Sequence, residues 1–521
     1  MDRLNPEHDP ALMAPAGSRA DRWLWLAGLA MALCLLARVL NAPVSRDEQI
    51  FFSVSLLGGA HDIYSVLGFN HLPNLPLLTG PLLQLSDRPF LVARLIVFAA
   101  WLASLALVAA HALRQTGSRS LAGLSMLLLA SSPLLLNETG TLFSNNLLPV
   151  PFAMAGVLLF LRAVEAAPPD RRLLLAAGVL LSLAAGLKAN YLFVIVPVGV
   201  AALLMPRALP AGQRLLKVAL PLLAGGMIGG APTLIRLARD PEGLLAHVVG
   251  YHTGPHRAQA AASSEDLVIS LGDRILLARQ LWGDGGTLLT GFLCVLLVLL
   301  LLRQGWRPGG GVWLLGAIIL LAAAMGLVPT PSFPQYFSLP VPFLILLMLM
   351  LVGALKGEGR ALAAPAFLAL ALVVLAVDGP RLARDLPRLA RPASWVPMKV
   401  HAISQQVVAA TGAGPVATLS PIYVLEAGGR IYPELAGGPF VYRVAHLIPA
   451  DQRRHYRAVV GASNLPAFLA ATPPTGVLVG EHGGHDDAFR AHASARGMRA
   501  VPLADAATRY GQLELFAAEA R

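Results

Sequence analysis

The chain has 521 residues, of which 56% are hydrophobic and only 13% are charged. A chain this apolar and this poor in charge is not an ordinary soluble globular protein. The formal net charge of +11 would suggest a nucleic-acid partner in a soluble protein. Here many basic residues lie in short loops between apolar runs, where membrane topology explains them and no nucleic acid is needed. Cys34 and Cys294, the two cysteines, lie inside apolar runs and form no disulfide framework.

Apolar segments recur through the first 378 residues and predict a polytopic α-helical membrane protein. Several are shorter than the roughly 20 residues that a helix needs to cross hydrocarbon, so their ends extend into the flanks. The first is predicted to be a retained anchor rather than a cleaved signal peptide. The eleven predicted spans are Trp23–Leu40, Pro89–Ala112, Leu121–Leu136, Leu147–Leu161, Leu173–Leu187, Tyr191–Met205, Leu215–Ile235, Leu288–Leu302, Val312–Val328, Leu339–Leu355 and Ala361–Val377.

Charge asymmetry between the loops predicts the orientation of these spans. With residues 1–22 in the cytoplasm, the inner loops carry many arginines and lysines, whereas the three short outer connections carry only Lys188. This pattern follows the positive-inside rule and suits a bacterial-type inner membrane. Two long loops, residues 43–88 and 236–286, then lie on the outer side.

Residues 379–521 differ in kind from the apolar segments. Short β-rich runs alternate with helical stretches, which predicts a soluble, periplasmic α/β domain. The runs are Val416–Leu419, Gly476–Val479 and Ala500–Leu503, and the stretches are Val400–Thr411 and Asp487–Arg496. Four arginines at 381, 384, 388 and 391 oppose the outer placement. An interfacial helix explains them, whereas a miscounted span would move the tail to the cytoplasm.

The acidic pair Asp47-Glu48 follows the first span within Val44-Ser-Arg-Asp-Glu-Gln-Ile-Phe-Phe52. Carboxylates beside a membrane are costly to desolvate, so they need a reason to be there. A buried acid at the mouth of a bundle is well placed to take a proton from an attacking hydroxyl, and the alternative is a solvated turn. Tyr64 and His71 follow among prolines and asparagines, which is typical of a shaped loop or of a simple turn.

Two further polar features lie on the predicted outer side. Lys188 stands alone between two apolar spans, where it is either an anion ligand or a lysine extended to the interface. The stretch from His247 to Arg257 holds three histidines and an arginine, and is either a site or a solvated loop. His252 and His256 are four residues apart, but Gly254-Pro255 between them argues against a metal site on one helix face. Glu481-His-Gly-Gly-His-Asp-Asp487 is a weaker metal candidate.

The order of these features resembles the GT-C superfamily of membrane glycosyltransferases, in particular its protein O-mannosyltransferase and lipid A aminoarabinose transferase branch. Arg94 near the start of the second span belongs to the same order. Gly186-Leu-Lys-Ala-Asn190 is similar to that branch's Gly-Leu-…-Lys turn, and Gln335-Tyr-Phe-Ser-Leu-Pro-Val-Pro342 to its Tyr-x-x-Leu-Pro start of a late span. The chain departs from the family at 137–146, where relatives often carry another acid. Either Glu138 substitutes for it, or Asn145 and Asn146 indicate a different metal or acceptor requirement.

The resemblance implies an inverting transfer of a sugar from a polyprenyl-phosphate donor to a glycan, lipid or protein acceptor on the outer face of the membrane. It implies Asp47 as the base, and Glu48 as a partner that shares the proton or binds hydroxyls. The remaining implied residues are Lys188, Arg257, His252 and His256 for the donor phosphate, and Tyr64, His71, Glu138 and Tyr336 for substrate. It fixes no cofactor, and a divalent cation stays open.

Two other classes of function stay open beside the transferase. A transporter or flippase of lipid-linked sugars also needs cations and acids near the membrane. Transporters usually place polar residues at mid-depth between repeated halves, whereas here they collect in outer loops. A non-catalytic lipid-binding scaffold of the same fold is the other alternative, because the expected acid near Asn145 is missing.

Overall fold

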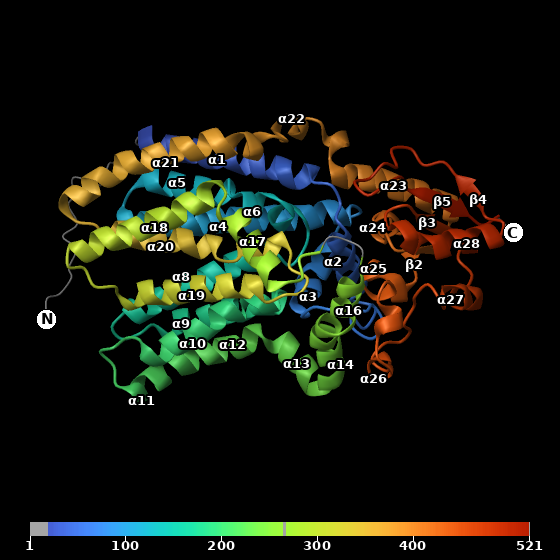
Figure 1. Cartoon of the computed structure of the whole chain (residues 1–521), viewed down its shortest axis with the longest axis horizontal. Helices are drawn as coiled ribbons and strands as arrows, with labels where there is room; N and C mark the ends of the chain where they lie inside the picture. Colours follow the sequence, from blue (N-terminus) through green and yellow to red (C-terminus); the bar gives the residue numbers. More distant parts are fainter. Residues whose placement is uncertain (1–18, 264–266, 520–521) are drawn as a thin grey trace.

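A long bundle of helices makes up most of the molecule, and a smaller part that contains strands lies at one end of it (Figure 1). This computed structural model describes residues 19–263 and 267–519, so the predicted segment 1–22 lies almost wholly outside the described residues. The bundle helices are α1 (Arg19–Asn41), α4 (Pro89–Thr116), α5 (Arg119–Ala130), α8 (Pro149–Glu165), α9 (Arg171–Leu187), α10 (Leu192–Leu204), α12 (Leu220–Gly229), α18 (Gly285–Arg303), α19 (Gly310–Leu327), α20 (Val341–Gly353) and α21 (Gly357–Ala383).

Every predicted span overlaps one of these helices. Within the described residues, six helices are long and apolar enough to cross a membrane, and a bent pair that includes α12 makes a seventh. The other four predicted spans are the shorter helices α5, α8, α9 and α10, of 12, 17, 17 and 13 residues. The structure therefore supports a multi-pass membrane protein, and the count of eleven spans stays a prediction.

Helices α9 and α12 pack closely against each other, because glycines lie at the contact between them. A Cβ atom at Gly178 of α9 would overlap the Leu222 carbonyl, and one at Gly225 of α12 would overlap the Leu175 carbonyl. Glycines at such positions let two helix backbones approach, which is how helices associate in lipid. The outer side of the neighbouring α10 is exposed and apolar along Leu192, Val196 and Val200, as a lipid-facing stripe requires.

The long loops fold into short helices at the end of the bundle that faces the strand-containing part (Figure 1). Helix α2 begins only five residues after α1 ends, so the acidic pair lies at the mouth of the bundle. The first loop contains α2 (Arg46–Leu57) and α3 (Asn74–Leu83). The second begins within α13 (Ala231–Arg239) and contains α14 (Pro241–Leu245), α15 (Tyr251–Thr253), α16 (Pro255–Ala262) and α17 (Leu271–Trp282).

The C-terminal part contains a five-stranded sheet of order β2-β1-β3-β5-β4. Strand β1 runs parallel to β2 and β3, and β5 runs antiparallel to β3 and β4. Three strands and two helices coincide with predicted ones, whereas β2 and β5 were not predicted. The elements are α23 (Val396–Thr411), β1 (Pro415–Thr418), α24 (Ile422–Leu425), β2 (Arg430–Ile431), α25 (Pro439–Tyr442), α26 (Ala450–Arg453), α27 (Leu465–Ala471), β3 (Gly476–Val479), α28 (Asp487–Ala495), β4 (Arg499–Val501) and β5 (Glu514–Ala517).

The arginines that opposed the predicted orientation lie around α22 (Leu386–Leu389), between the bundle and the sheet (Figure 1). Asp385 is buried there, and its carboxylate lies 2.7 Å from Arg38 of α1 and 3.3 Å from Arg388. Arg381 lies 3.3 Å from both Asp284 and Asp378. These arginines therefore neutralise local acids, and the sheet lies at the same end of the bundle as the two long loops.

Candidate active site

Helix α2 separates the two members of the acidic pair. Consecutive helical residues point about 100° apart, so neighbours in sequence face different surroundings. Glu48 is fully buried and meets Arg94 of α4, whose Nη2 donates to Oε2 at 2.7 Å and whose Nε lies 2.7 Å from Oε1. The Phe143 amide donates to the same carboxylate at 2.7 Å. Burial raises the pKa of Glu48, and the ion pair and the amide oppose that rise.

This geometry gives Glu48 a structural role. Through these contacts it fastens α2 to the bundle, and its predicted part in proton sharing or hydroxyl binding stays a prediction. Arg94 is equally buried, and it also donates to the carbonyls of Val39 and Thr141. The pair therefore ties α2 and α4 to the end of α1 and to the segment after α6 (Pro133–Leu136).

Asp47 is partly exposed and faces a different group of side chains. Its carboxylate interacts electrostatically with Lys188, Tyr251 and Tyr336. These residues come from three separate regions of the chain: the turn after α9, the second long loop and the short helix η5 (Pro334–Ser338) before α20. The structure thus brings together Asp47, Lys188 and Tyr336, which lie far apart in the sequence and to which the resemblance gave roles in one site.

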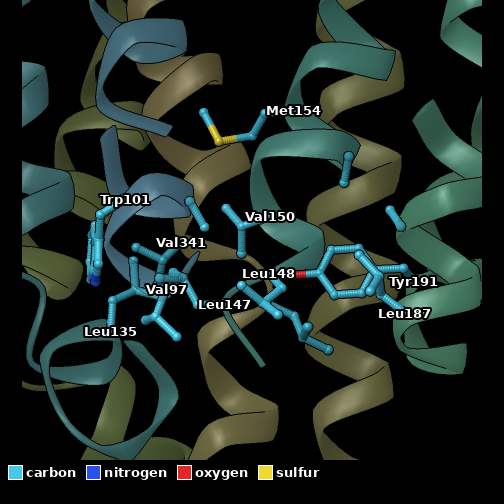
Figure 2. Close-up of a cluster of buried hydrophobic side chains, with 14 of the residues drawn as sticks. Val97, Trp101, Leu135, Leu147, Leu148, Val150, Met154, Leu187, Tyr191 and Val341 are labelled. Atoms are coloured by element: carbon cyan, nitrogen blue, oxygen red, sulfur yellow. The ribbon is translucent and has the colours of Figure 1, made fainter. Parts of the chain in front are cut away.

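Lys188 lies in the turn between α9 and the short helix η2 (Ala189–Tyr191). Its neighbours Leu187 and Tyr191 belong to the buried apolar cluster in Figure 2, which keeps the lysine 95% buried. Its Nζ donates to Asn146 Oδ1 at 2.5 Å and lies 5.2 Å from the Tyr336 ring centroid. Burial lowers the pKa of Lys188 to about 8, and the Asp47 carboxylate acts to raise it. The ammonium is therefore charged at neutral pH, although it is buried.

Three histidines form a row beside this pair. The His71 ring lies 5.1 Å from Phe51 of α2 and 5.5 Å from His252, and His252 lies 5.8 Å from His256. His252 Nε2 is 2.9 Å from the Asn70 carbonyl, so the two outer loops meet at this row. Burial lowers the pKa of all three imidazoles, that of His256 to about 3. They are neutral at pH 7 and act as hydrogen-bonding groups rather than cations.

Tyr64 contacts the loop segment that carries His71, the first of the three histidines. Its hydroxyl donates to the His71 carbonyl at 3.1 Å, and its ring lies under the guanidinium of Arg236 at 5.1 Å. Arg236 also donates to Asp62 at 2.7 Å, which links α13 to the first loop. Because Tyr64 is buried, its geometry favours shaping the loop over contacting a substrate.

One predicted residue lies away from the site. Arg257 is exposed on α16, and the arginine beside His256 is instead Arg443, which directly follows α25 in the C-terminal part. Arg443 Nη2 lies 3.3 Å from His256 Nδ1. The side chain of Glu138 lies outside the described residues. Arg443 was not selected from the sequence, because it belongs to no motif with a chemical signature, and Asn146 was noted only for a possible metal or acceptor requirement and not as a partner of Lys188.

The C-terminal part also binds α2 directly. Gln49 Nε2 donates to Glu481 Oε2 at 3.0 Å, and Arg46 donates to the Glu481 carbonyl at 3.0 Å. Ser420 and Tyr423 donate to the same buried carboxylate at 2.9 and 3.1 Å. Glu481 therefore serves as a hydrogen-bond acceptor for its neighbours rather than as a metal ligand. Across the described residues, no group of three or more His, Cys, Asp or Glu side chains is arranged to hold a metal ion.

Comparison with known proteins agrees with this fold. Residues 76–210 match the family described as "PMT: Dolichyl-phosphate-mannose-protein mannosyltransferase". The chain shares its fold with two structures of ArnT, and together with the family match this confirms the resemblance to GT-C membrane glycosyltransferases noted in the sequence. No curated protein sequence matches the chain significantly.

Three solved structures illustrate the similarity. ArnT from Cupriavidus metallidurans in the apo state is 14% identical, with a TM-score of 0.62 over 97% of this chain and 100% of ArnT. The same protein bound to undecaprenyl phosphate is 15% identical, with a TM-score of 0.60 over 96% and 100%. The arabinofuranosyltransferase AftD from Mycobacteria is 14% identical, with a TM-score of 0.51 over 97% of this chain and 40% of AftD.

Proposed function

We propose that the chain is an inverting glycosyltransferase that takes a sugar from a polyprenyl-phosphate donor. In this reaction an acceptor hydroxyl oxygen attacks the anomeric carbon while the bond from that carbon to the phosphate oxygen breaks. Asp47 accepts the hydroxyl proton, and Lys188 stabilises the negative charge that the departing phosphate gains. The acceptor is a glycan, lipid or protein of the cell envelope.

The observation that carries the proposal is the position of Asp47 next to the buried ammonium of Lys188. A base and a cation on opposite sides of a reacting centre are what this displacement needs. A lysine that merely extended to the interface would not be buried against an amide oxygen and an aromatic ring, as Lys188 is against Asn146 and Tyr336. The neutral histidines and Tyr336 beside the pair can hold sugar hydroxyls or phosphate oxygens through hydrogen bonds.

The fold of the relatives supports a lipid-linked donor, since ArnT has been solved bound to undecaprenyl phosphate. We assign residues 23–378 to the catalytic membrane domain and residues 379–521 to an outer α/β domain. We assign the N-terminus to the cytoplasm and the site to the periplasmic face of the inner membrane, because the basic loops then lie inside. No metal is required by this scheme, and a divalent cation stays an untested alternative.

The test compares cells that carry the wild type, a deletion, Asp47→Asn and the control Asp87→Asn at matched expression. Asp87 is an exposed acid of the same loop. Mass spectrometry of envelope lipids, glycans and proteins should show one glycoform that is lost in the deletion and in Asp47→Asn but kept in Asp87→Asn. If Asp47→Asn keeps that glycoform while the deletion loses it, the transferase assignment is wrong, and a transporter or scaffold takes its place.

A further inference from the structure

The C-terminal part contributes one guanidinium to the histidine row, and this group lacks the usual partner of a buried arginine. Arg443 is partly buried, and its Nε atom is buried with no hydrogen-bond partner. In the described part of the chain no carboxylate oxygen lies within 4 Å of its guanidinium. Other arginines of the C-terminal part, such as Arg454 and Arg490, do have a carboxylate within that distance. A guanidinium withdrawn from water without an anion is energetically costly, so the site favours an anion from outside the chain.

The surroundings of Arg443 provide hydrogen-bonding groups, and an acid that acts on its neighbour Tyr251 is Asp47, the candidate base. His256 accepts from it through Nδ1 at 3.3 Å, and its guanidinium lies 5.1 Å from the Phe440 ring centroid. Tyr251 is a further hydrogen-bonding neighbour, and the Tyr251 and His256 rings are stacked at 5.6 Å. Burial and Arg443 itself lower the pKa of His256, so the positive charge at this end of the row belongs to the arginine.

We propose that Arg443, His256 and Tyr251 form a phosphoryl-binding subsite that the C-terminal part and the second long loop build together. The planar guanidinium suits two oxygens of one phosphate, and the neutral His256, whose Nδ1 accepts from Arg443, keeps its Nε2 N–H to donate to another. The Tyr251 hydroxyl donates to the Phe440 carbonyl at 2.9 Å, so this residue positions the subsite. The subsite lies at the far end of the histidine row from Lys188, with His71 and His252 between them. It rests on the proposed function, since it adds a second cation to the same site. The phosphoryl group belongs either to the lipid donor or to a water-soluble substrate.

Isothermal titration of the purified full-length protein in detergent tests the subsite with two probes, undecaprenyl phosphate and inorganic phosphate. The variants are Arg443→Gln, Arg443→Lys and the control Arg496→Gln, which changes an exposed arginine of the same part. Loss of a charge-assisted contact should weaken binding of at least one probe between about tenfold and about a hundredfold in Arg443→Gln. The affinity of Arg443→Lys should lie between those of the wild type and Arg443→Gln, because lysine keeps the positive charge but lacks the planar guanidinium that can bind two oxygens. The control should bind as the wild type does.

Each outcome decides the question. Weaker binding of undecaprenyl phosphate assigns the subsite to the lipid donor, and weaker binding of inorganic phosphate alone assigns it to a soluble phosphate. Unchanged affinities of both Arg443 variants for both probes overturn the subsite, even if Asp47→Asn still abolishes transfer. If the wild type fails to bind undecaprenyl phosphate, the donor class of the proposed function is wrong, and the inorganic phosphate arm alone decides the subsite. Arg443→Lys preserves the test if Arg443→Gln does not fold.

Discussion

The ion pair between Glu48 and Arg94 should be one of the strongest single attachments of α2 to the bundle. Both side chains are 0% exposed, and each contact between them is 2.7 Å long. Glu48→Gln keeps the shape but leaves the guanidinium without its counter-charge, with the carbonyls of Val39 and Thr141 as its remaining described acceptors. Breaking a buried pair from one side typically costs about 3–5 kcal/mol. We expect Glu48→Gln to lower the free energy of unfolding by this amount.

The matched control is Glu165→Gln, which breaks the pair between Glu165 and Arg114. That pair is also short, at 2.5 Å, but its side chains are 54% and 46% exposed. Solvent screens exposed pairs, so its loss should cost at most about 1 kcal/mol. Chemical denaturation in detergent micelles measures both variants, and the double variant Glu48→Gln, Arg94→Gln should recover part of the loss because no charge is left unpaired. Equal, small effects of Glu48→Gln and Glu165→Gln would refute the reasoning.

Three further predictions follow from other parts of the structure. Lys188 has a pKa of about 8, so its ammonium loses its charge as the pH rises through 8, and kcat/KM of the wild type should fall there. Lys188→Arg should remove that fall because arginine stays charged. If the pH profile of Lys188→Arg is the same as that of the wild type, Lys188 does not bind the phosphate. Gly225→Ala should destabilise the protein by about 1–3 kcal/mol because the new methyl group meets the Leu175 carbonyl, whereas Gly199→Ala, which meets nothing within 4 Å, should have no such cost in the same thermal assay. Glu481→Gln should lower kcat about tenfold or more with little change in KM, because it weakens the hydrogen bond that holds Gln49 of α2, the helix that carries Asp47. A change in KM alone would count against this positioning role of Glu481.

Hydropathy made the bundle predictable. Each of the eleven apolar segments overlaps a helix, because a backbone in lipid must satisfy its hydrogen bonds internally. The ends were less predictable: the segment predicted as Leu215–Ile235 bends by 69° between α12 and α13. In the tail, β2 has only two residues, too few to leave a pattern of alternation.

The site was predictable residue by residue only where the chain itself marks a chemical anomaly. An acid beside a span and a lone lysine between two spans are costly wherever the chain puts them, so Asp47 and Lys188 stood out. The different environments of Asp47 and Glu48 depend on the packing of α2, which a dipeptide does not encode. The contact of Arg443 with His256 joins segments 187 residues apart, and no local pattern reports it.

Helix α2 connects to the bundle through Glu48 and to the C-terminal part through its neighbours Arg46 and Gln49. The candidate base Asp47 therefore lies where the bundle and the C-terminal part meet, and both parts, which are far apart in sequence, fix its position. A chimaera that exchanged residues after Trp395 for those of a relative without an acid at position 481 would remove the side-chain acceptor of Gln49 while leaving the membrane helices intact. Such a protein would insert into the membrane normally, but α2 and its Asp47 would be less firmly positioned. The two parts are consequently expected to be interchangeable only when α2 is transplanted with the tail.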